Sequence, residues 1–185
     1  SGFGQSGPDT ALPAYDIIVQ ALSGWMDATG EAGGGPLKVG EALGDVAAGL
    51  YAAIGILAAL VGRGRTGEGA ALDVAMLDCL VAMLPTSHAL HLYAGQSVAR
   101  VGNRHPLSTP FGGYRTADGH VIIAVLGARQ FAALCRLVGR PEAADDPRFA
   151  TDEGRTAHEP EIRALIEDWS ARLSTDDAVA ALRAA

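Results

Sequence analysis

Apolar residues recur at helical spacing in the first part of the chain and predict two helices there. The first runs over residues 13–26, and the glycines at 30 and 33–35 end it. The second runs over residues 43–61 and holds 16 consecutive apolar or small residues, 46–61. A membrane span needs about 18 or more. This pattern therefore predicts a helix buried in a protein core.

The pattern then predicts a turn over residues 63–69, a short strand over 71–75 and a third helix over 77–93. Residues 95–110 have no regular period. We expect this segment to be irregular.

The second part of the chain predicts a hairpin followed by three helices. Alternating residues at 111–116 and 120–125 flank the turn Ala117-Asp118-Gly119, which is a hairpin signal. Helical patterns then follow at 128–138, at 159–173 and from Thr175, where the spacing from Ser174 or Thr175 to Asp177 resembles a helix cap.

Composition narrows the class of protein. Of the 185 residues, 49% are hydrophobic and 19% charged, which excludes disorder as a global description. The net charge, 14 − 21 = −7, has the wrong sign for a nucleic-acid-binding surface, so we expect no nucleic-acid partner. We also expect no membrane partner. The cysteines, Cys79 and Cys135, lie too far apart for a disulfide framework or a zinc knuckle. We therefore expect a cytoplasmic protein and no metal.

Charge also divides the chain. Residues 1–95 hold nine acidic but only three basic side chains, whereas residues 96–185 hold twelve acids and eleven arginines. We predict a domain boundary near residue 96. Because residues 1–95 carry few charged side chains, we expect them to belong to the interior of a large protein. Because the chain opens on a loop without an initiator Met and stops inside a helical pattern, we expect it to be an excised part of a longer protein.

Two short motifs suggest chemistry but have simpler interpretations. Gly2-x-Gly4-x-x-Gly7 matches a dinucleotide-binding fingerprint, which also needs a strand before it and a helix after it. Pro8 and Pro13 interrupt any such helix, which favours a glycine loop. His88 and His91 stand three apart on a predicted helix and could ligate a metal, but no third ligand has matching spacing. Surface or interface histidines are favoured.

Asp45 is the strongest candidate for chemistry. It stands at the head of the long apolar helix, after Leu43-Gly44, with no cation nearby in sequence. Asp is among the best helix N-cap residues, and this structural role is slightly favoured. A carboxylate at the positive end of a helix can also attack an acyl group covalently. Both roles are compatible.

Several motifs together resemble the class III CoA-transferase family, which includes formyl-CoA transferase, carnitine CoA-transferase and α-methylacyl-CoA racemase. Their order and spacing over nearly the whole chain carry the resemblance. The motifs are Ser1-Gly2-Phe3-Gly4-Gln5-x-Gly7-Pro8, Pro13-Ala14-Tyr15-Asp16, Leu43-Gly44-Asp45-x-x-x-Gly49, Arg65-Thr66-Gly67-x-Gly69, Asp73-Val74-x-Met76-Leu77-Asp78, Gly102-Asn103-x-His105-Pro106, Asp118-Gly119 and Asp146-Pro147-Arg148-Phe149.

The resemblance implies an acyl-CoA:carboxylate CoA-transferase in which Asp45 attacks an acyl-CoA thioester and forms an acyl-aspartyl anhydride. An aspartyl-CoA thioester then delivers CoA to a second carboxylic acid. Coenzyme A is thus a substrate, and no tightly bound cofactor or metal is implied. The segment Leu12, Pro13, Ala14 and Tyr15 would lie along the CoA.

Two positions bear on the subclass. The racemase branch has a proton-transferring His where this chain has Tyr15, and a phenol, which ionises near pH 10, is a poor base at neutral pH. A transferase is therefore favoured over a racemase-type epimerase. A degenerate or structural family member is the non-enzymatic alternative.

After Asn103, formyl-CoA transferases carry glycines where this chain has Arg104-His105-Pro106, so a different acyl donor or acceptor is expected. His105 and Pro106 could contact substrate, and a structural role for His105 is equally compatible.

The resemblance also implies an α/β fold. Residues 1–95 would be part of a Rossmann-like large CoA-binding domain that carries Asp45. Residues 96–185 would be a linker and a small α+β domain, incomplete at its C-terminus. The full-length protein would be a homodimer of interlocked chains.

Overall fold

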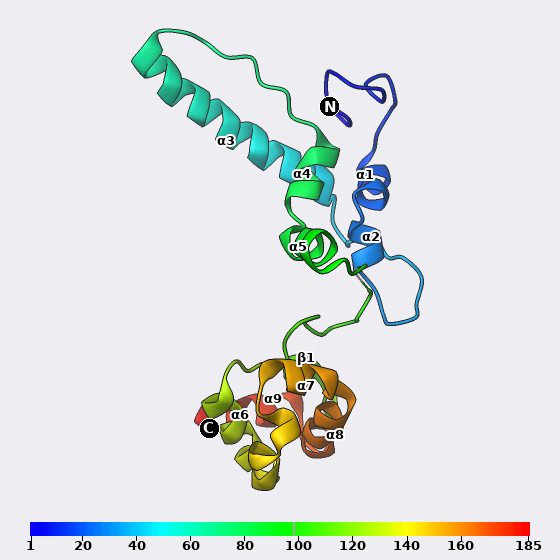
Figure 1. The fold of residues 1–185 in the computed structure, drawn as a ribbon, viewed down its shortest axis with the longest axis vertical. Helices are drawn as coiled ribbons and strands as arrows, with labels where there is room; N and C mark the ends of the chain where they lie inside the picture. The colour runs from blue at the N-terminus through cyan, green and yellow to red at the C-terminus, as the bar shows by residue number, and fades with distance from the viewer. Residues whose placement is uncertain (98) are drawn as a thin grey trace. The chain divides into compact units, whose positions relative to one another are not determined.

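The computed structural model describes residues 1–97 and 99–185, which form two compact units, Ser1–Gly102 and Asn103–Ala185 (Figure 1). We refer to them as unit 1 and unit 2. Unit 1 ends six residues after the change in composition at residue 96. The assignment of these parts to a large and a small domain stays a prediction.

Unit 1 is helical, and two of the three helices that the sequence predicts there are each divided into two shorter ones, whereas the helix predicted over 43–61 extends to Thr66. The helices of unit 1 are α1 (Asp16–Leu22), α2 (Trp25–Ala28), α3 (Leu43–Thr66), α4 (Met76–Ala82) and α5 (Pro85–Ala94).

Two local breaks explain the shorter helices. The helix predicted over 13–26 divides at Gly24, whose φ of 92° is left-handed. The helix predicted over 77–93 divides before Pro85, which has no N–H to donate and restricts the residue before it.

The core of unit 1 forms where α1, α3 and α4 meet. Val19, Ala47, Cys79 and Leu80 are its buried residues. At Gly44 the first turn of α3 lies directly against α1, because a β-carbon there would be 2.8 Å from Val19 Cγ2. Only glycine allows this approach without a shift of either helix.

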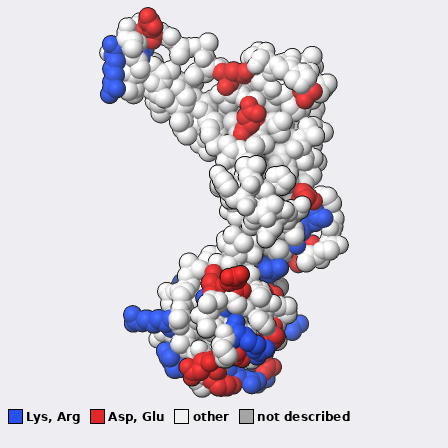
Figure 2. All heavy atoms as spheres, in the orientation of Figure 1, with Lys and Arg blue, Asp and Glu red and all other residues white. Residues whose placement is uncertain are grey.

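Within the described residues, helix α3 is not buried as its sequence predicts. Only Gly44 and Ala47 are buried along its 24 residues, because α1 and α4 cover its first turns alone. Its large apolar side chains, drawn in white in Figure 2, lie at the surface of unit 1, and they are Val46, Leu50, Tyr51, Ile54, Ile56, Leu57, Leu60 and Val61. By length and composition α3 could cross a membrane. Core helices of large proteins pass the same test.

The strand predicted over 71–75 is also wrong, because these residues have no strand partner among the described residues. The segment lies against the start of the chain instead. Met76 and Leu77 donate their N–H groups to the carbonyls of Ser1 and Gly2, which satisfies the first turn of α4. Asp73 Oδ2 accepts the Gln5 N–H at 2.6 Å. The Gly2–Gly7 segment is thus a glycine loop that lies against residues 73–77.

Unit 2 is built on the hairpin β1 (Phe111–Arg115) and β2 (His120–Ala124), which pair antiparallel with Tyr114 opposite Val121. The elements that follow are α6 (Ala128–Leu137), the 3-10 turns η1 (Pro141–Asp145) and η2 (Pro147–Phe149), α7 (Asp152–Ala157), α8 (Glu159–Ser170) and α9 (Thr175–Ala184). The predicted hairpin and the three predicted helices are confirmed. Ser174 Oγ accepts the Asp177 N–H at 3.1 Å, which confirms the predicted cap.

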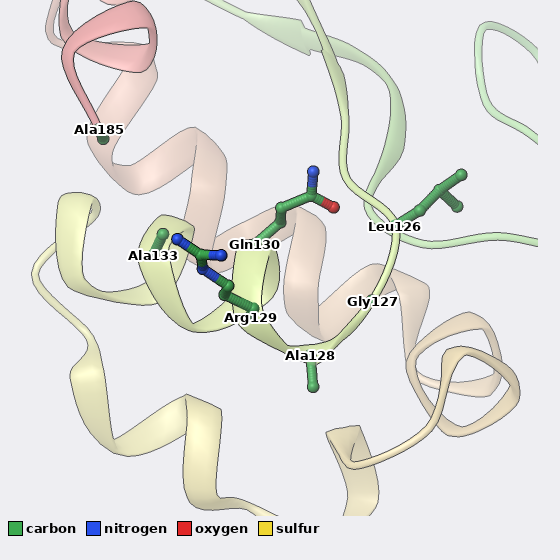
Figure 3. A pocket seen from close by; sticks show the side chains of 7 residues that line it. All are labelled: Leu126, Gly127, Ala128, Arg129, Gln130, Ala133 and Ala185. Carbon is green, nitrogen blue, oxygen red and sulfur yellow. The ribbon is translucent and has the colours of Figure 1, made fainter.

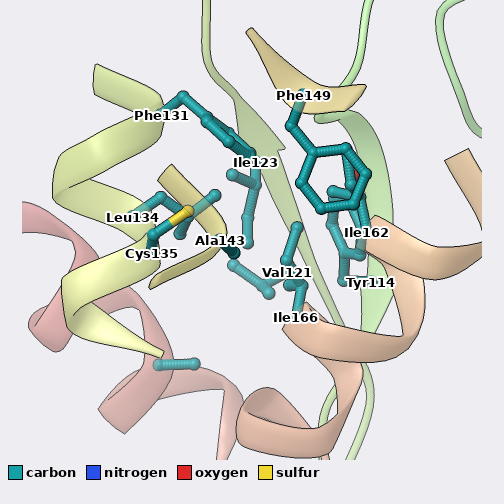
Figure 4. Packing of buried hydrophobic residues seen from close by; sticks show 11 residues of the cluster. Tyr114, Val121, Ile123, Phe131, Leu134, Cys135, Ala143, Phe149, Ile162 and Ile166 are labelled. Atoms are coloured by element: carbon teal, nitrogen blue, oxygen red, sulfur yellow. The ribbon is translucent and has the colours of Figure 1, made fainter. Parts of the chain in front are cut away.

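The alternation of the hairpin decides where the core of unit 2 sits. Tyr114, Val121 and Ile123 point to one face of the hairpin, where side chains from α6 and α8 cover them (Figure 4). Arg155 is buried beside this core. Its guanidinium donates to the carbonyls of Thr109 and Phe149 and to Asp152 Oδ1. Because these acceptors compensate for its burial, the charge is compatible with a packed interior.

Asp118 joins the hairpin turn to the start of α9. Its carboxylate accepts hydrogen bonds from the Thr175 hydroxyl and N–H, both at 2.8 Å. These bonds hold the pKa of Asp118 below its ordinary value. A carboxylate with a lowered folded-state pKa stabilises the fold above its unfolded pKa, and this contribution disappears as the pH falls through the folded pKa.

We therefore expect Asp118→Asn to lower the stability of unit 2 at pH 7, and the difference from wild type to shrink toward pH 3. Urea unfolding followed by the fluorescence of Trp169, in a Trp25→Phe background, measures this difference. Asp145→Asn is the matched control, since Asp145 is exposed and accepts no hydrogen bond in the described structure. A difference that does not change with pH contradicts the prediction.

Candidate active site

Asp45 lies in the first turn of α3, two residues after the helix begins, and its side chain is exposed. It is not the N-cap. Ala42 occupies that position and makes no side-chain cap bond. Within residues 1–97 and 99–185, no hydrogen bond or ion pair engages the Asp45 carboxylate. The N-cap role that the sequence slightly favours is therefore wrong, and the carboxylate is free to react.

Asp16 satisfies the start of α3 in its place. Its Oδ1 accepts the Gly44 N–H at 2.7 Å, from across the contact between α1 and α3. This contact could not be read from sequence, because a residue 28 positions away supplies the cap. The bond joins Asp16 to Gly44. It therefore also brings Tyr15, which precedes Asp16, and Asp45, which follows Gly44, to the same end of unit 1.

The predicted CoA-binding segment precedes α1. Tyr15 is 77% exposed and Leu12 is 55% exposed. Pro13 is exposed as well, and Ala14 is half-buried against the core of unit 1. These apolar groups are accessible to a ligand on the side of unit 1 where α3 begins.

His105 and Pro106 belong to unit 2, and the contacts of His105 are structural. Its N–H donates to the Phe111 carbonyl, its Nδ1 accepts the Leu107 N–H at 3.1 Å, and its ring packs on Phe111 with centroids 5.1 Å apart. These bonds shape the irregular segment before β1. A substrate contact by either residue stays a prediction.

Within residues 1–97 and 99–185, the two cysteines and the pair His88 and His91 offer no alternative nucleophile or metal site. Burial raises the pKa of the Cys79 thiol, and it raises the pKa of Cys135 to about 11, so both stay protonated at neutral pH. His88 and His91 line a pocket of about 280 Å³ with Asp27. Among the residues that the structure describes, no group of three or more His, Cys, Asp or Glu side chains could hold a metal.

A larger pocket, of about 460 Å³, lies in unit 2 at the start of α6 (Figure 3). Arg129 is its one charged side chain, beside Gln130, Leu126 and small residues. It holds no nucleophile and no general base. Asp45 therefore remains the candidate for chemistry.

The family model for CoA-transferase family III matches residues 1–185. The chain belongs to CoA-transferase family III. It is 40% identical over 181 residues to the succinate–glutarate CoA-transferase of Agrobacterium fabrum, covering 98% of this chain and 45% of that protein. It is 44% identical over 170 residues to the acetyl-CoA:oxalate CoA-transferase of Acetobacter aceti, covering 90% and 43%. The resemblance drawn from the motifs is confirmed.

The fold agrees with that of solved family members. A CaiB/BaiF family protein from Brucella suis matches the whole chain with a TM-score of 0.83 and 38% identity, over 49% of its own length. The mixed helix and strand architecture is thus that of CoA-transferase family III. The chain spans less than half the length of these relatives.

The contact between α1 and α3 can be tested at Gly44. We expect Gly44→Ala to destabilise unit 1 by about 1–3 kcal/mol, because the new β-carbon overlaps Val19. Gly62→Ala is the matched control on the same helix. Nothing lies within 4 Å of the β-carbon it adds, so it should stabilise α3 by up to about 1 kcal/mol.

The labelling rate of the buried Cys79 thiol, in a Cys135→Ala background, reports opening of this core. Faster labelling in Gly44→Ala and unchanged or slower labelling in Gly62→Ala is the expected result. Equal rates in both variants would contradict the close approach at Gly44.

Proposed function

We propose that the protein carrying this chain is an acyl-CoA:carboxylate CoA-transferase whose nucleophile is Asp45. One observation carries the proposal: the Asp45 carboxylate is exposed and without a partner in the described structure, next to Gly44, whose N–H is accepted by a different residue, Asp16. Family membership supports the reaction class.

The proposed reaction proceeds by exchange of acyl groups on Asp45. A carboxylate oxygen of Asp45 attacks the thioester carbonyl of the donor, the C–S bond breaks, and CoA leaves as a thiolate. The thiolate then attacks the aspartyl carbonyl of the mixed anhydride and releases the donor acid as its carboxylate. The acceptor carboxylate attacks the resulting aspartyl-CoA thioester, the C–S bond breaks, CoA leaves again as a thiolate, and a second anhydride forms. The thiolate then attacks the acceptor carbonyl of this anhydride, which gives the CoA thioester of the acceptor and releases the Asp45 carboxylate.

This sequence of steps needs no net proton transfer, because each step exchanges one anionic nucleophile for one anionic leaving group. It therefore suits a site that offers an exposed carboxylate and no strong base. The N–H groups of the first turn of α3 favour negative charge beside them, which supports Asp45 in its ionised, nucleophilic form. Tyr15, in place of a proton-transferring His, supports a transferase over an epimerase.

The named relatives support a substrate class. Their names pair succinate with glutarate and acetyl-CoA with oxalate. We propose that the donor is the CoA thioester of a small carboxylic acid and that the acceptor is a small dicarboxylate. Coenzyme A enters as substrate, along Leu12, Pro13, Ala14 and Tyr15, and no tightly bound cofactor is part of the proposal.

We further propose that the exposed apolar face of α3 is covered in the full-length protein. The relatives are about twice as long as this chain, and the large side chains from Val46 to Val61 need a partner surface. A Rossmann-like large domain that includes residues 1–95, in an interlocked homodimer, would supply it. A cytoplasmic location also stays a prediction.

The nucleophile is tested by trapping. The full-length protein is incubated with a panel of acyl-CoAs, including those of succinate, glutarate and acetate, and is trapped with hydroxylamine. Mass spectrometry of the peptides should find the modification at Asp45. The donor that gives it identifies the substrate. If no donor modifies Asp45, α-proton exchange in deuterated water separates an epimerase from a protein without activity.

We expect Asp45→Asn to lower the transfer rate by about 10⁴- to 10⁶-fold, as the loss of a nucleophile does. Its melting temperature should match that of wild type, because the side chain has no partner to lose in the described structure. Asp78→Asn is the matched control, since Asp78 is exposed at the same position of the first turn of α4. It should keep the wild-type rate. An active Asp45→Asn protein would contradict the proposal.

A further inference from the structure

Gln20 is a buried polar residue that the proposed reaction does not use. It lies on α1 with none of its surface exposed, among the apolar residues of the unit 1 core. Its carboxamide is nevertheless fully engaged. Nε2 donates to Asp16 Oδ2 at 2.7 Å and to the Glu41 carbonyl at 3.1 Å, and Oε1 accepts the Val39 N–H at 2.8 Å.

These partners form a single network around the start of α3. Asp16 uses its second oxygen for the Gly44 N–H, so Gln20 and Asp16 together hold the backbone at Val39, Glu41 and Gly44. The segment between these points is not helical, since Ala42 has φ −77° and ψ 67°. The Leu43 N–H also donates to the Glu41 carbonyl at 2.9 Å, but that bond lies within the loop. Within the described residues, the bonds of Gln20 and Asp16 are those that tie residues 39–44 to α1.

The position of Asp45 depends on this backbone alone. Its carboxylate has no hydrogen-bond partner in the described part of the chain, so no side-chain contact orients it. Gly44, which Asp16 holds, is its neighbour in the chain. A displacement of the first turn of α3 would therefore move the attacking oxygens by a similar amount. A shift of about 1 Å in a reacting group can cost about 100-fold in rate.

We infer that Gln20 is a positioning residue for Asp45, which it orients through Asp16 and the backbone of residues 39–44. The inference rests on the proposed function, because it assigns Gln20 a role in the reaction of Asp45. Gln20 does not touch the reacting atoms.

The experiment uses the full-length protein and the acyl-CoA that labels Asp45. Gln20→Met keeps the volume of the side chain and removes its hydrogen bonds. We expect the single-turnover rate of Asp45 acylation at saturating acyl-CoA to fall by about 10- to 100-fold. The dissociation constant for CoA should stay within about twofold, because Gln20 is fully buried and is not one of the residues proposed to bind CoA.

Asp16→Asn and Gln20→Glu test the hydrogen bond between these two side chains and keep a polar group at each position. The carboxamide introduced by Asp16→Asn would still accept the Gly44 N–H, but its NH₂ group would face the NH₂ group of Gln20. The carboxylate introduced by Gln20→Glu would place an oxygen against the carboxylate of Asp16 and the Glu41 carbonyl. Each single variant should slow acylation. The double variant Asp16→Asn/Gln20→Glu restores a donor and an acceptor between the two positions and should recover part of the rate, which loss of packing alone does not predict.

Gln96→Met is the control, since Gln96 is exposed in unit 1 and far along the chain from α3. It should acylate at the wild-type rate. Hydrogen exchange of the peptide that spans residues 39–45 gives a readout independent of catalysis. It should be faster in Gln20→Met and unchanged in Gln96→Met. In Gln20→Met the Val39 amide loses its acceptor, and the Asp16 carboxylate, which accepts the Gly44 N–H, loses its hydrogen bond from Gln20.

The outcomes separate the two proposals. Acylation of Asp45 in wild type and slower acylation in Gln20→Met, with unchanged CoA binding, supports the inference. Wild-type rates in all Gln20 and Asp16 variants, or slower rates explained entirely by weaker CoA binding, overturn it. If Gln20→Met does not fold, absence of any recovery in the double variant overturns it. If the wild-type protein itself is never acylated at Asp45, the proposed function fails, and the inference fails with it.

Discussion

The close approach of α1 and α3 at Gly44 is the constraint on which the rest of unit 1 depends. It requires a residue without a β-carbon at Gly44, an acceptor on α1 for the N–H exposed there, and a small residue one turn later. Gly44, Asp16 and Ala47 meet these three requirements. Since Asp16 on α1 accepts the Gly44 N–H, the residue that follows Gly44 does not serve as its cap. That residue is Asp45, and its exposed carboxylate is the group we propose for catalysis.

The two units differ in how complete they are as folded bodies. Unit 2 has a core that the hairpin, α6 and α8 enclose, and even its buried Arg155 has acceptors for its charge. Unit 1 has a small core at one end of α3 and leaves most of that helix exposed. A membrane span and a protein interior would both accept such a helix. Membership of CoA-transferase family III, whose members are about twice as long, favours the protein interior.

The mechanism and the architecture are linked through buried polar groups. A buried side chain that hydrogen-bonds at every polar atom has one favoured orientation, because any other leaves a group unsatisfied in the core. Gln20 is such a side chain, and its partners lie on the loop that leads into α3. An apolar residue could fill the same space, but it would not hold the loop. In the role that we infer for Gln20, the core of unit 1 therefore determines the position of Asp45.

The sequence by itself determined the family, the candidate nucleophile and the hairpin and three longer helices of unit 2, but not η1, η2 and α7, because hydrophobic period, turn residues and caps act over a few positions. It also placed helices in unit 1, but not the breaks at Gly24 and before Pro85, where local conformation overrides a continuous apolar pattern. It predicted a strand at 71–75 that has no partner among the described residues, and it favoured Asp45 as a cap. Only the tertiary structure decided that Asp16 is the cap, that Gln20 is buried, and that α3 is exposed. Each of these depends on contacts between residues far apart in sequence, which no local pattern records.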